Sequence, residues 1–151
     1  MRSEPTLGGA PYGELRSLAA REGVEDAISF EGQKRHTEVA EWMAAADLLC
    51  LPSKREGCPN VVLEALASGI PVVASAVGTI PEFVDEHSGI VVPPGDPGAL
   101  ADALAAALRR EWDPLAIRNR LDGLSWESVA KRYTDQFVRA VAPALGTDPA
   151  R

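Results

Sequence analysis

The feature that most constrains this chain is the alternation of short apolar runs with segments of helical periodicity. Asp47–Leu51 is a near-continuous apolar run that Pro52 ends, and Ile70–Ala74 is a second such run. Runs of this kind are typical of strands buried on both faces of a parallel sheet. Between them, Asn60–Ser68 is predicted to be a helix that Gly69 closes at its C-terminus. The strand, helix and strand together span about 28 residues, the size of a βαβ unit.

The same alternation continues on both sides of this unit. Before it, Ala27–Phe30 predicts a short strand. A helix is then predicted from an i, i+3, i+4, i+7 face that consists of Val39, Trp42, Met43 and Ala46. After the unit, we expect a short helix near Pro81–Asp85 and a strand at Gly89–Val92. The pattern therefore predicts an α/β fold with a parallel sheet.

Two further helices are predicted in the C-terminal part of the chain. Asp96 is a good N-cap and Pro97 a good first residue for the first of them. Its apolar stripe consists of Leu100, Ala103, Leu104, Ala107 and Leu108. The last helix starts near Ser125 and carries Val129, Tyr133, Phe137 and Val141 on one face. We expect residues 1–142 to form one partial domain and residues 143–151 to be a frayed tail.

Composition narrows the classes of function. The chain has 151 residues, 46% of them hydrophobic, which is enough for a core in one domain. A net charge of −7 disfavours nucleic acids and anionic lipid surfaces, but backbone amides can still hold a small anionic ligand. Two cysteines are too few for a disulfide scaffold, and Cys50 in its apolar run is expected to be a buried free thiol. Without a recognisable signal peptide or membrane span, we expect a cytoplasmic protein.

The loop after Leu51 combines several features of an anion site. Ligands of open α/β sheets bind at the carboxyl ends of the strands, near the N-termini of helices. Gly57 lets a ligand approach the backbone closely, and Pro59 and Asn60 begin a helix whose free amides favour an anion such as a diphosphate. Lys54 and Arg55 add local positive charge. The loop is therefore our candidate binding site.

Two glutamates, Glu56 and Glu64, flank the start of this helix. Both can face one cleft, and a carboxylate can accept two hydrogen bonds from a vicinal diol such as that of ribose or a hexose. Spacing alone favours a simpler interpretation, in which Glu64 is a solvated helix residue and Glu56 is a surface charge. Two glutamates eight residues apart are common, so the surrounding sequence has to decide between these interpretations.

That surrounding sequence resembles the GT-B glycosyltransferases of family 4. The similarity covers Ala45–Ser53 and Glu56–Ser75, which contain the Glu-x7-Glu motif of these retaining, nucleotide-sugar-dependent enzymes. Their Val-Gly-Gly-x-Pro-Glu loop corresponds to Val77–Glu82, where Thr79 replaces the second glycine. Further matches are Phe30–Gly32, Gly89–Pro97 and Ser125–Glu127. The resemblance spans roughly residues 8 to 138. It implies a Rossmann-like parallel sheet with helices on both faces, in the C-terminal, donor-binding half of a GT-B fold.

The resemblance also implies roles for particular residues. Glu56 is expected to meet the hydroxyls of the donor sugar as the catalytic residue, and Glu64 to bind the ribose. The backbone from Gly57 to Val62 is expected to cradle the sugar and diphosphate, and the loop from Gly32 to Lys34 to form the wall beside the nucleobase. The implied donor-binding set is Glu56, Gly57, Cys58, Pro59, Asn60, Val61, Glu64, Gly32 and Gln33. No metal and no cofactor besides the nucleotide-sugar donor is implied.

A complete family member is about twice as long, because it also has an acceptor-binding domain. Here the resemblance begins at Gly8–Pro11, which looks like the end of the family's second strand. The first strand, with its diphosphate-binding Arg and Lys, would lie outside this chain. In the family's sheet these strands separate the counterparts of Ala27–Phe30 and Asp47–Leu51. Since an unpaired buried backbone group costs about 1–3 kcal/mol, we expect a marginal, aggregation-prone fold unless a partner supplies the missing strands.

Three functions are compatible with these observations. The first is the donor-binding half of a retaining hexosyltransferase that works with a separate acceptor domain or subunit. Any contact with the inner membrane face would be made through that partner. The second is a non-catalytic nucleotide-sugar-binding module or a truncated remnant. The third and weakest is a nucleotide-sugar epimerase of the same fold, whose usual histidine and carboxylate set is not visible.

Overall fold

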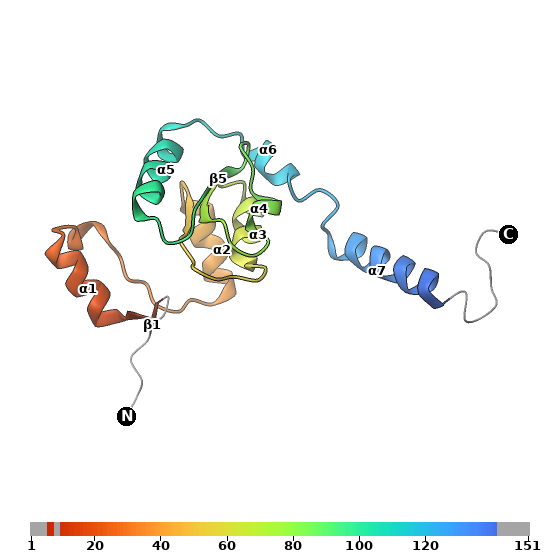
Figure 1. The fold of residues 1–151 in the computed structure, drawn as a ribbon, viewed down its shortest axis with the longest axis horizontal. Coiled ribbons are helices and arrows are strands. Elements are labelled where there is room, and N and C mark those ends of the chain that lie inside the picture. Colours follow the sequence, from red (N-terminus) through yellow and green to blue (C-terminus); the bar gives the residue numbers. More distant parts are fainter. Residues whose placement is uncertain (1–5, 8–9, 142–151) are drawn as a thin grey trace, which may run out of the picture. The chain divides into compact units, whose positions relative to one another are not determined.

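The computed structural model describes residues 6–7 and 10–141, which form two compact units (Figure 1). Residues 1–45 make up the first unit and residues 46–151 the second. The sheet expected from the sequence lies in the second unit. The expected tail, residues 143–151, lies outside the described residues.

The second unit is built on a three-stranded parallel sheet. Its strands are β3 (Leu49–Leu51), β4 (Val72–Ser75) and β5 (Gly89–Val92), in the order β3-β4-β5. Leu49 pairs with Val72, and Val72 in turn pairs with Gly89. The carboxyl ends of the three strands therefore lie together at one edge of the sheet. The predicted α/β fold with a parallel sheet is therefore confirmed.

Helices follow each strand, and their ends obey the expected local chemistry. They are α3 (Asn60–Ser68), α4 (Ile80–Phe83), α5 (Pro97–Arg109), α6 (Pro114–Asn119) and α7 (Trp126–Val141). Gly69 ends α3 in the left-handed conformation, with φ of 78°. The Asp96 carboxylate accepts a hydrogen bond from the Ala99 N–H, as predicted for the N-cap of α5. Asp113 caps α6 in the same way, a helix that the sequence analysis did not predict.

The helices bury both faces of the sheet (Figure 1). On one face, Val73 and Val92 pack against Ala103 and Ala107 of α5. Because side chains alternate along a strand, Val72 and its neighbours point to the other face, where α3 contacts β3 and β4. These small aliphatic contacts explain how a chain with few aromatic residues still forms a core.

Ser88, which precedes β5, provides a test of this core. Its side chain is fully buried, accepts a hydrogen bond from the Asp85 N–H at 3.0 Å and donates one to Asp85 Oδ1 at 2.9 Å. Ser88→Ala would leave these Asp85 groups without their partner, so we expect it to lower the free energy of unfolding by about 1–3 kcal/mol. Urea denaturation measures this loss. Ser75→Ala is the matched control, because that equally buried hydroxyl has no hydrogen-bond partner among the described residues.

The contacts between Asp85 and Ser88 also make the stability of the fold depend on pH. Burial by itself would raise the pKa of Asp85, but hydrogen bonds from the Ser88 hydroxyl and the His87 N–H, together with the Arg120 charge, hold the pKa below its usual range. A lowered folded-state pKa contributes stability that is present above the usual carboxylate pKa near 4 and is lost as the pH falls below it. In Ser88→Ala, this loss on acidification should be smaller than in the wild type. An equal loss in both would show that Ser88 does not hold the carboxylate charge.

The first unit contains two helices and a short antiparallel ladder. The ladder pairs β1 (Thr6–Leu7) with β2 (Ala10–Pro11), and the helices are α1 (Tyr12–Arg21) and α2 (His36–Ala45). The predicted strand Ala27–Phe30 is wrong. A 3₁₀ helix, η1 (Glu25–Ala27), takes its first residue, and the rest is irregular. Among the described residues no strand runs beside this segment, and a strand without a neighbour has no hydrogen-bond ladder to join.

Three side chains expected to be buried are exposed. Cys50 lies on β3, which is an edge strand among the described residues, so its thiol is exposed although partial desolvation raises its pKa. Trp42 is 49% exposed, with the Lys34 ammonium over its ring, because only the adjacent Met43 points inward from α2. Leu108 is 63% exposed near the end of α5, although the adjacent Ala107 is buried against the sheet. In each case the periodicity identified an apolar residue but not what would cover it.

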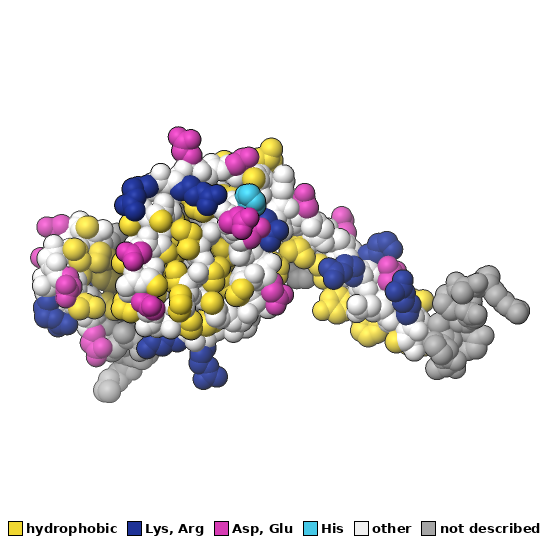
Figure 2. All heavy atoms as spheres, turned by 45° about the horizontal axis from the view of Figure 1, so that its top comes forward, with side chains coloured by type: hydrophobic (Ala, Val, Ile, Leu, Met, Phe, Trp, Pro, Cys, Tyr) yellow, Lys and Arg dark blue, Asp and Glu magenta, His cyan; other side chains and the backbone are white. Residues whose placement is uncertain are grey.

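The predicted apolar face of α7 is also exposed. Tyr133 and Phe137 are 60% and 67% exposed, and Val141 is also exposed. Figure 2 shows hydrophobic side chains along one side of α7 and charged ones along the other. The helix is thus amphipathic, as the sequence predicts, without a described element packed on its apolar side.

Candidate donor site

The candidate loop, residues 52–59, connects the carboxyl end of β3 to the N-terminus of α3. No side chain caps α3, whose first turn closes with a hydrogen bond from the Val62 N–H to the Pro59 carbonyl. The start of α3 therefore presents backbone N–H groups at the edge of the sheet where the strands end. This is the arrangement in which backbone amides and the helix dipole stabilise an anion.

A second loop, which follows β4, holds the candidate loop in position. The N–H and the hydroxyl of Thr79 both donate to the Gly57 carbonyl, at 2.9 and 3.3 Å. Gly78, with φ of 56°, lies very close to the candidate loop. A Cβ added to it would be 2.2 Å from the backbone carbonyl oxygen of Gly57 and 2.7 Å from that of Glu56. The two loops meet because β3 and β4 are adjacent parallel strands that end at the same edge. Gly78 and Thr79 thus fix the backbone at Glu56 and Gly57.

The two glutamates lie on the same loop–helix segment. Glu56 is exposed, and its Oε1 accepts a hydrogen bond from the Ser53 hydroxyl at 2.7 Å. Glu64 is half-buried on α3, one helical turn after Asn60. The structure therefore gives the two carboxylates different surroundings, one accessible on the loop and one set into the helix flank.

The rest of the candidate donor set lies between these glutamates. Gly57 and Asn60 are exposed, and a Cβ at Gly57 would meet no atom within 4 Å. Cys58 is an exposed free thiol, and Pro59 and Val61 are half-buried. The backbone that the sequence analysis assigned to the sugar and diphosphate is thus open to solvent.

Gly32 and Gln33, the expected wall beside the base, belong to the first unit. Both are exposed, and the Gly32 N–H donates to the Tyr12 hydroxyl at 2.7 Å. The Tyr12 ring in turn contacts the Phe30 ring, with 5.5 Å between the centroids. This loop is therefore held by α1 within its own unit, and the donor set is divided between the two units.

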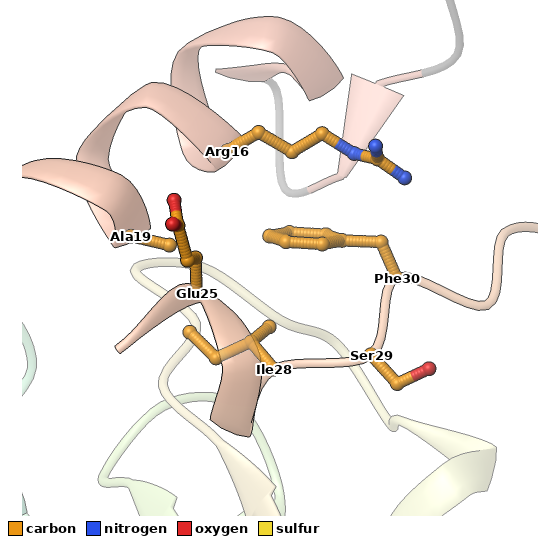
Figure 3. A pocket seen from close by; sticks show the side chains of 6 residues that line it. All are labelled: Arg16, Ala19, Glu25, Ile28, Ser29 and Phe30. Atoms are coloured by element: carbon orange, nitrogen blue, oxygen red, sulfur yellow. The ribbon is translucent and has the colours of Figure 1, made fainter. Parts of the chain in front are cut away.

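A hollow of about 440 Å³ lies beside this loop (Figure 3). Arg16 of α1 extends over the Phe30 ring, with 5.4 Å between its guanidinium carbon and the centroid. Glu25 and Ile28 form the opposite side. One face of the Phe30 ring is thus covered by a cation, and Glu25 adds a negative charge on the opposite side of the hollow.

Comparison with known proteins identifies the family. The family model for group 1 glycosyl transferases matches residues 6–110. The chain is a group 1 glycosyltransferase sequence. It is similar to D-inositol 3-phosphate glycosyltransferase of Streptomyces bingchenggensis, with 36% identity over 91% of this chain and 32% of the relative. It is also similar to the lipopolysaccharide core mannosyltransferase LpsB of Rhizobium meliloti, with 40% identity over 62% of the chain and 27% of the relative.

Solved structures agree with this assignment to the GT-B glycosyltransferases. Sucrose-phosphate synthase from Thermosynechococcus elongatus superposes with a TM-score of 0.71 and 31% identity, over 87% of this chain and 34% of that one. Anabaena HepE, solved in complex with UDP, gives a TM-score of 0.56 and 27% identity over 79% of this chain and 36% of that one. The chain therefore spans about a third of the length of the glycosyltransferases it matches, so the expectation that family members are about twice as long is too low.

Within this glycosyltransferase sequence, two site features were not assigned from the residues alone. Gly78 and Thr79 belong to the family's small-residue loop, but the sequence does not indicate their contact with Gly57. The available signal was Thr79 itself, a hydroxyl where the family pattern has glycine. A further residue, Ser75 at the end of β4, carried no sequence signal beyond being a small polar residue that ends an apolar strand.

Two kinds of feature are absent from the described part of the chain. No group of three or more His, Cys, Asp or Glu side chains there is arranged to hold a metal ion. None of the described helices combines the length and the apolar character that a bilayer crossing requires.

Proposed function

We propose that this chain is the donor-binding half of a glycosyltransferase that transfers a hexose from a nucleotide-diphosphate sugar with retention of configuration. The observation that supports it most is the Glu56–Glu64 segment: a backbone open to solvent, an uncapped helix start and two carboxylates. Solved GT-B relatives that bind UDP support a nucleotide-sugar donor. The chain's share of its relatives' length supports an acceptor-binding part outside this sequence.

In this proposal, each part of the segment has one task. The N-terminus of α3 stabilises the diphosphate as it leaves, an electrostatic contribution that grows as negative charge develops. Glu56 accepts hydrogen bonds from the hydroxyls of the donor sugar, and Glu64 accepts them from the ribose diol. Gly32 and Gln33, which belong to the first unit, are assigned to the base by the family resemblance alone. No protein base and no metal ion is assigned, since the resemblance to the family implies that the donor phosphate would help to deprotonate the acceptor.

Calorimetric titration of the chain with UDP, GDP and ADP tests the proposal. We expect one nucleotide to bind, and Glu64→Ala to weaken it by about 1–3 kcal/mol, the cost of leaving buried polar groups unpaired. EDTA should not change the affinity. Glu127→Ala, which removes an exposed glutamate from the first turn of α7, is the control and should bind like the wild type.

The alternative outcome is equally informative. If the chain is folded, as judged by circular dichroism, and no nucleotide gives heat, the donor site is absent and the chain is a remnant of the fold. If a nucleotide binds but the wild type and Glu64→Ala do so equally, the ribose assignment is wrong. Transfer activity then has to be sought with the acceptor-binding half added, because binding alone also fits a non-catalytic module.

A further inference from the structure

A second hollow lies at the carboxyl edge of the sheet, and its lining includes Pro52 and Lys54 from the start of the candidate loop but neither Glu56 nor Glu64. Its volume is about 260 Å³, and it is lined from all three strand ends. Pro52 follows β3, Ser75 ends β4 and Val92 ends β5. Because Ser75 pairs with Val92, their side chains share the face that α5 covers, and Leu100 of α5 closes that side. All of these residues belong to the second unit.

The hydroxyl of Ser75 is the most informative group in this hollow. Ser75 is only 2% exposed, yet its hydroxyl forms no hydrogen bond with any described residue. No fully buried side-chain oxygen or nitrogen in the described residues lacks a partner, so the Ser75 oxygen must reach the hollow itself. Water in the hollow can therefore hydrogen-bond this oxygen in the free chain. A ligand hydroxyl or anion in the hollow would take the place of that water.

Two charged side chains define the ligand's chemistry. Lys54 lines the hollow and forms no ion pair with any described residue, so its ammonium can pair with an anionic group. Asp96 also lines it, with Oδ1 committed to the Ala99 N–H. Its other oxygen can accept a hydrogen bond from a ligand hydroxyl. A cation and an acceptor in one small space fit a molecule that carries both an anionic group and hydroxyls.

The size and the walls restrict the ligand further. A cavity of about 150 Å³ can hold benzene, so 260 Å³ accommodates one six-membered ring with its substituents. Pro93, Pro97 and Leu100 supply apolar walls, against which the C–H face of a sugar ring can pack. We infer that this hollow, centred on Ser75 and Lys54, is a second binding site for a monosaccharide-sized polyol with one anionic group. The site does not depend on the proposed donor site.

Calorimetry of the full 151-residue chain with four probes tests this inference. Glucose 6-phosphate and glucuronate carry the phosphate and the carboxylate form of the anion, and glucose and inorganic phosphate each lack one half of the chemistry. We expect one of the two anionic sugars to bind at least about ten times more tightly than glucose or phosphate, because only it engages both Lys54 and the hydroxyl acceptors. Its affinity should fall as the salt concentration rises.

Two substitutions locate the binding. Ser75→Ala should weaken the anionic sugar about three- to ten-fold, the loss of one hydrogen bond, and Lys54→Met about ten-fold or more. Glu64→Ala should leave this affinity unchanged, and Ser75→Ala should leave nucleotide binding unchanged. The amide NMR spectrum locates the binding without any substitution. The anionic sugar should shift the backbone amide signals of Ser75, Val92 and Gly95. It should leave those of Asn60 and Val61 in place.

Several results would overturn the inference. They are the absence of saturable binding by all four probes at millimolar concentration, glucose binding as tightly as the anionic sugars, or affinities unchanged in both Ser75→Ala and Lys54→Met. Loss of sugar binding in Glu64→Ala would instead put the probe in the donor segment and overturn the second site. Failure of the donor proposal can be distinguished from failure of this inference. In that case no nucleotide binds, while the anionic sugar still shifts the amide signals of Ser75 and Gly95.

Discussion

Replacing Gly78 with alanine is expected to weaken nucleotide-sugar binding by about ten- to a hundred-fold while the chain stays folded. The new Cβ would lie 2.2 Å from the Gly57 carbonyl oxygen, a backbone atom that cannot rotate away. The loop that carries Glu56 would have to shift by roughly 1 Å. A misplacement of this size can cost about a hundred-fold in catalytic rate, and we expect a loss of up to that order in affinity. Calorimetry with the bound nucleotide, and later with its sugar, measures the loss.

The control for this substitution is Gly95→Ala. Gly95 also has a positive φ, of 77°, but its added Cβ would meet no atom within 4 Å. It therefore carries the backbone strain of Gly78→Ala, on the order of 1 kcal/mol, without the contact with Glu56 and Gly57. Nucleotide binding should be unchanged in Gly95→Ala. Unchanged binding in Gly78→Ala would show that the loop position does not determine donor affinity.

Gly57→Ala distinguishes an effect on the loop itself from an effect on its contact with the ligand. Its Cβ would lie in open space in the free chain, and the folded state should be as stable as the wild type. A loss of nucleotide-sugar affinity in this variant would therefore report that the ligand itself approaches the backbone at this residue, as the donor proposal requires.

Leu66→Ala is expected to destabilise the second unit by about 3–5 kcal/mol. Leu66 is fully buried in α3, which packs against α6, β3 and β4, and its removal would leave a cavity in this packing. Whole domains are stable by only about 5–15 kcal/mol, so this single change should remove a large part of the stability. Urea unfolding followed by circular dichroism measures this loss as a lower midpoint with an unchanged m-value.

Leu108→Ala is the matched control for this prediction. It makes the same substitution in a helix, with the same change in helix propensity, but Leu108 is 63% exposed. We expect a loss below about 1 kcal/mol. Similar losses for the two variants would mean that α3 does not pack on the sheet as described.

The elements of the second unit follow from local rules that the sequence displays openly. The apolar runs became β3, β4 and β5, because a strand buried in a parallel sheet has to be apolar on both faces. Asp96 and Gly69 set the ends of α5 and α3 through their own backbone and side-chain chemistry. Each of these features depends on a few neighbouring residues, which is why it could be predicted without the structure.

Long-range features were not predictable in this way. Ala27–Phe30 has the composition of a strand, but it lacks a described neighbour with which to form a ladder. Leu66 and Leu108 look alike in sequence, and only the packing of their helices buries one and exposes the other. The expectation of a marginal fold for the isolated chain stays a prediction, which the urea experiments also test.

For the candidate site, the sequence determined the residues and the tertiary structure decided their surroundings. The motif identified Glu56, Glu64 and the glycine between them, because the resemblance depends on residue type and spacing. The contact of Gly78 and Thr79 with Gly57, and the unpartnered Ser75 hydroxyl, arise where the ends of separate strands meet. Such contacts join residues about 20 positions apart, so no local pattern records them, and only the pairing of β3 with β4 brings them together.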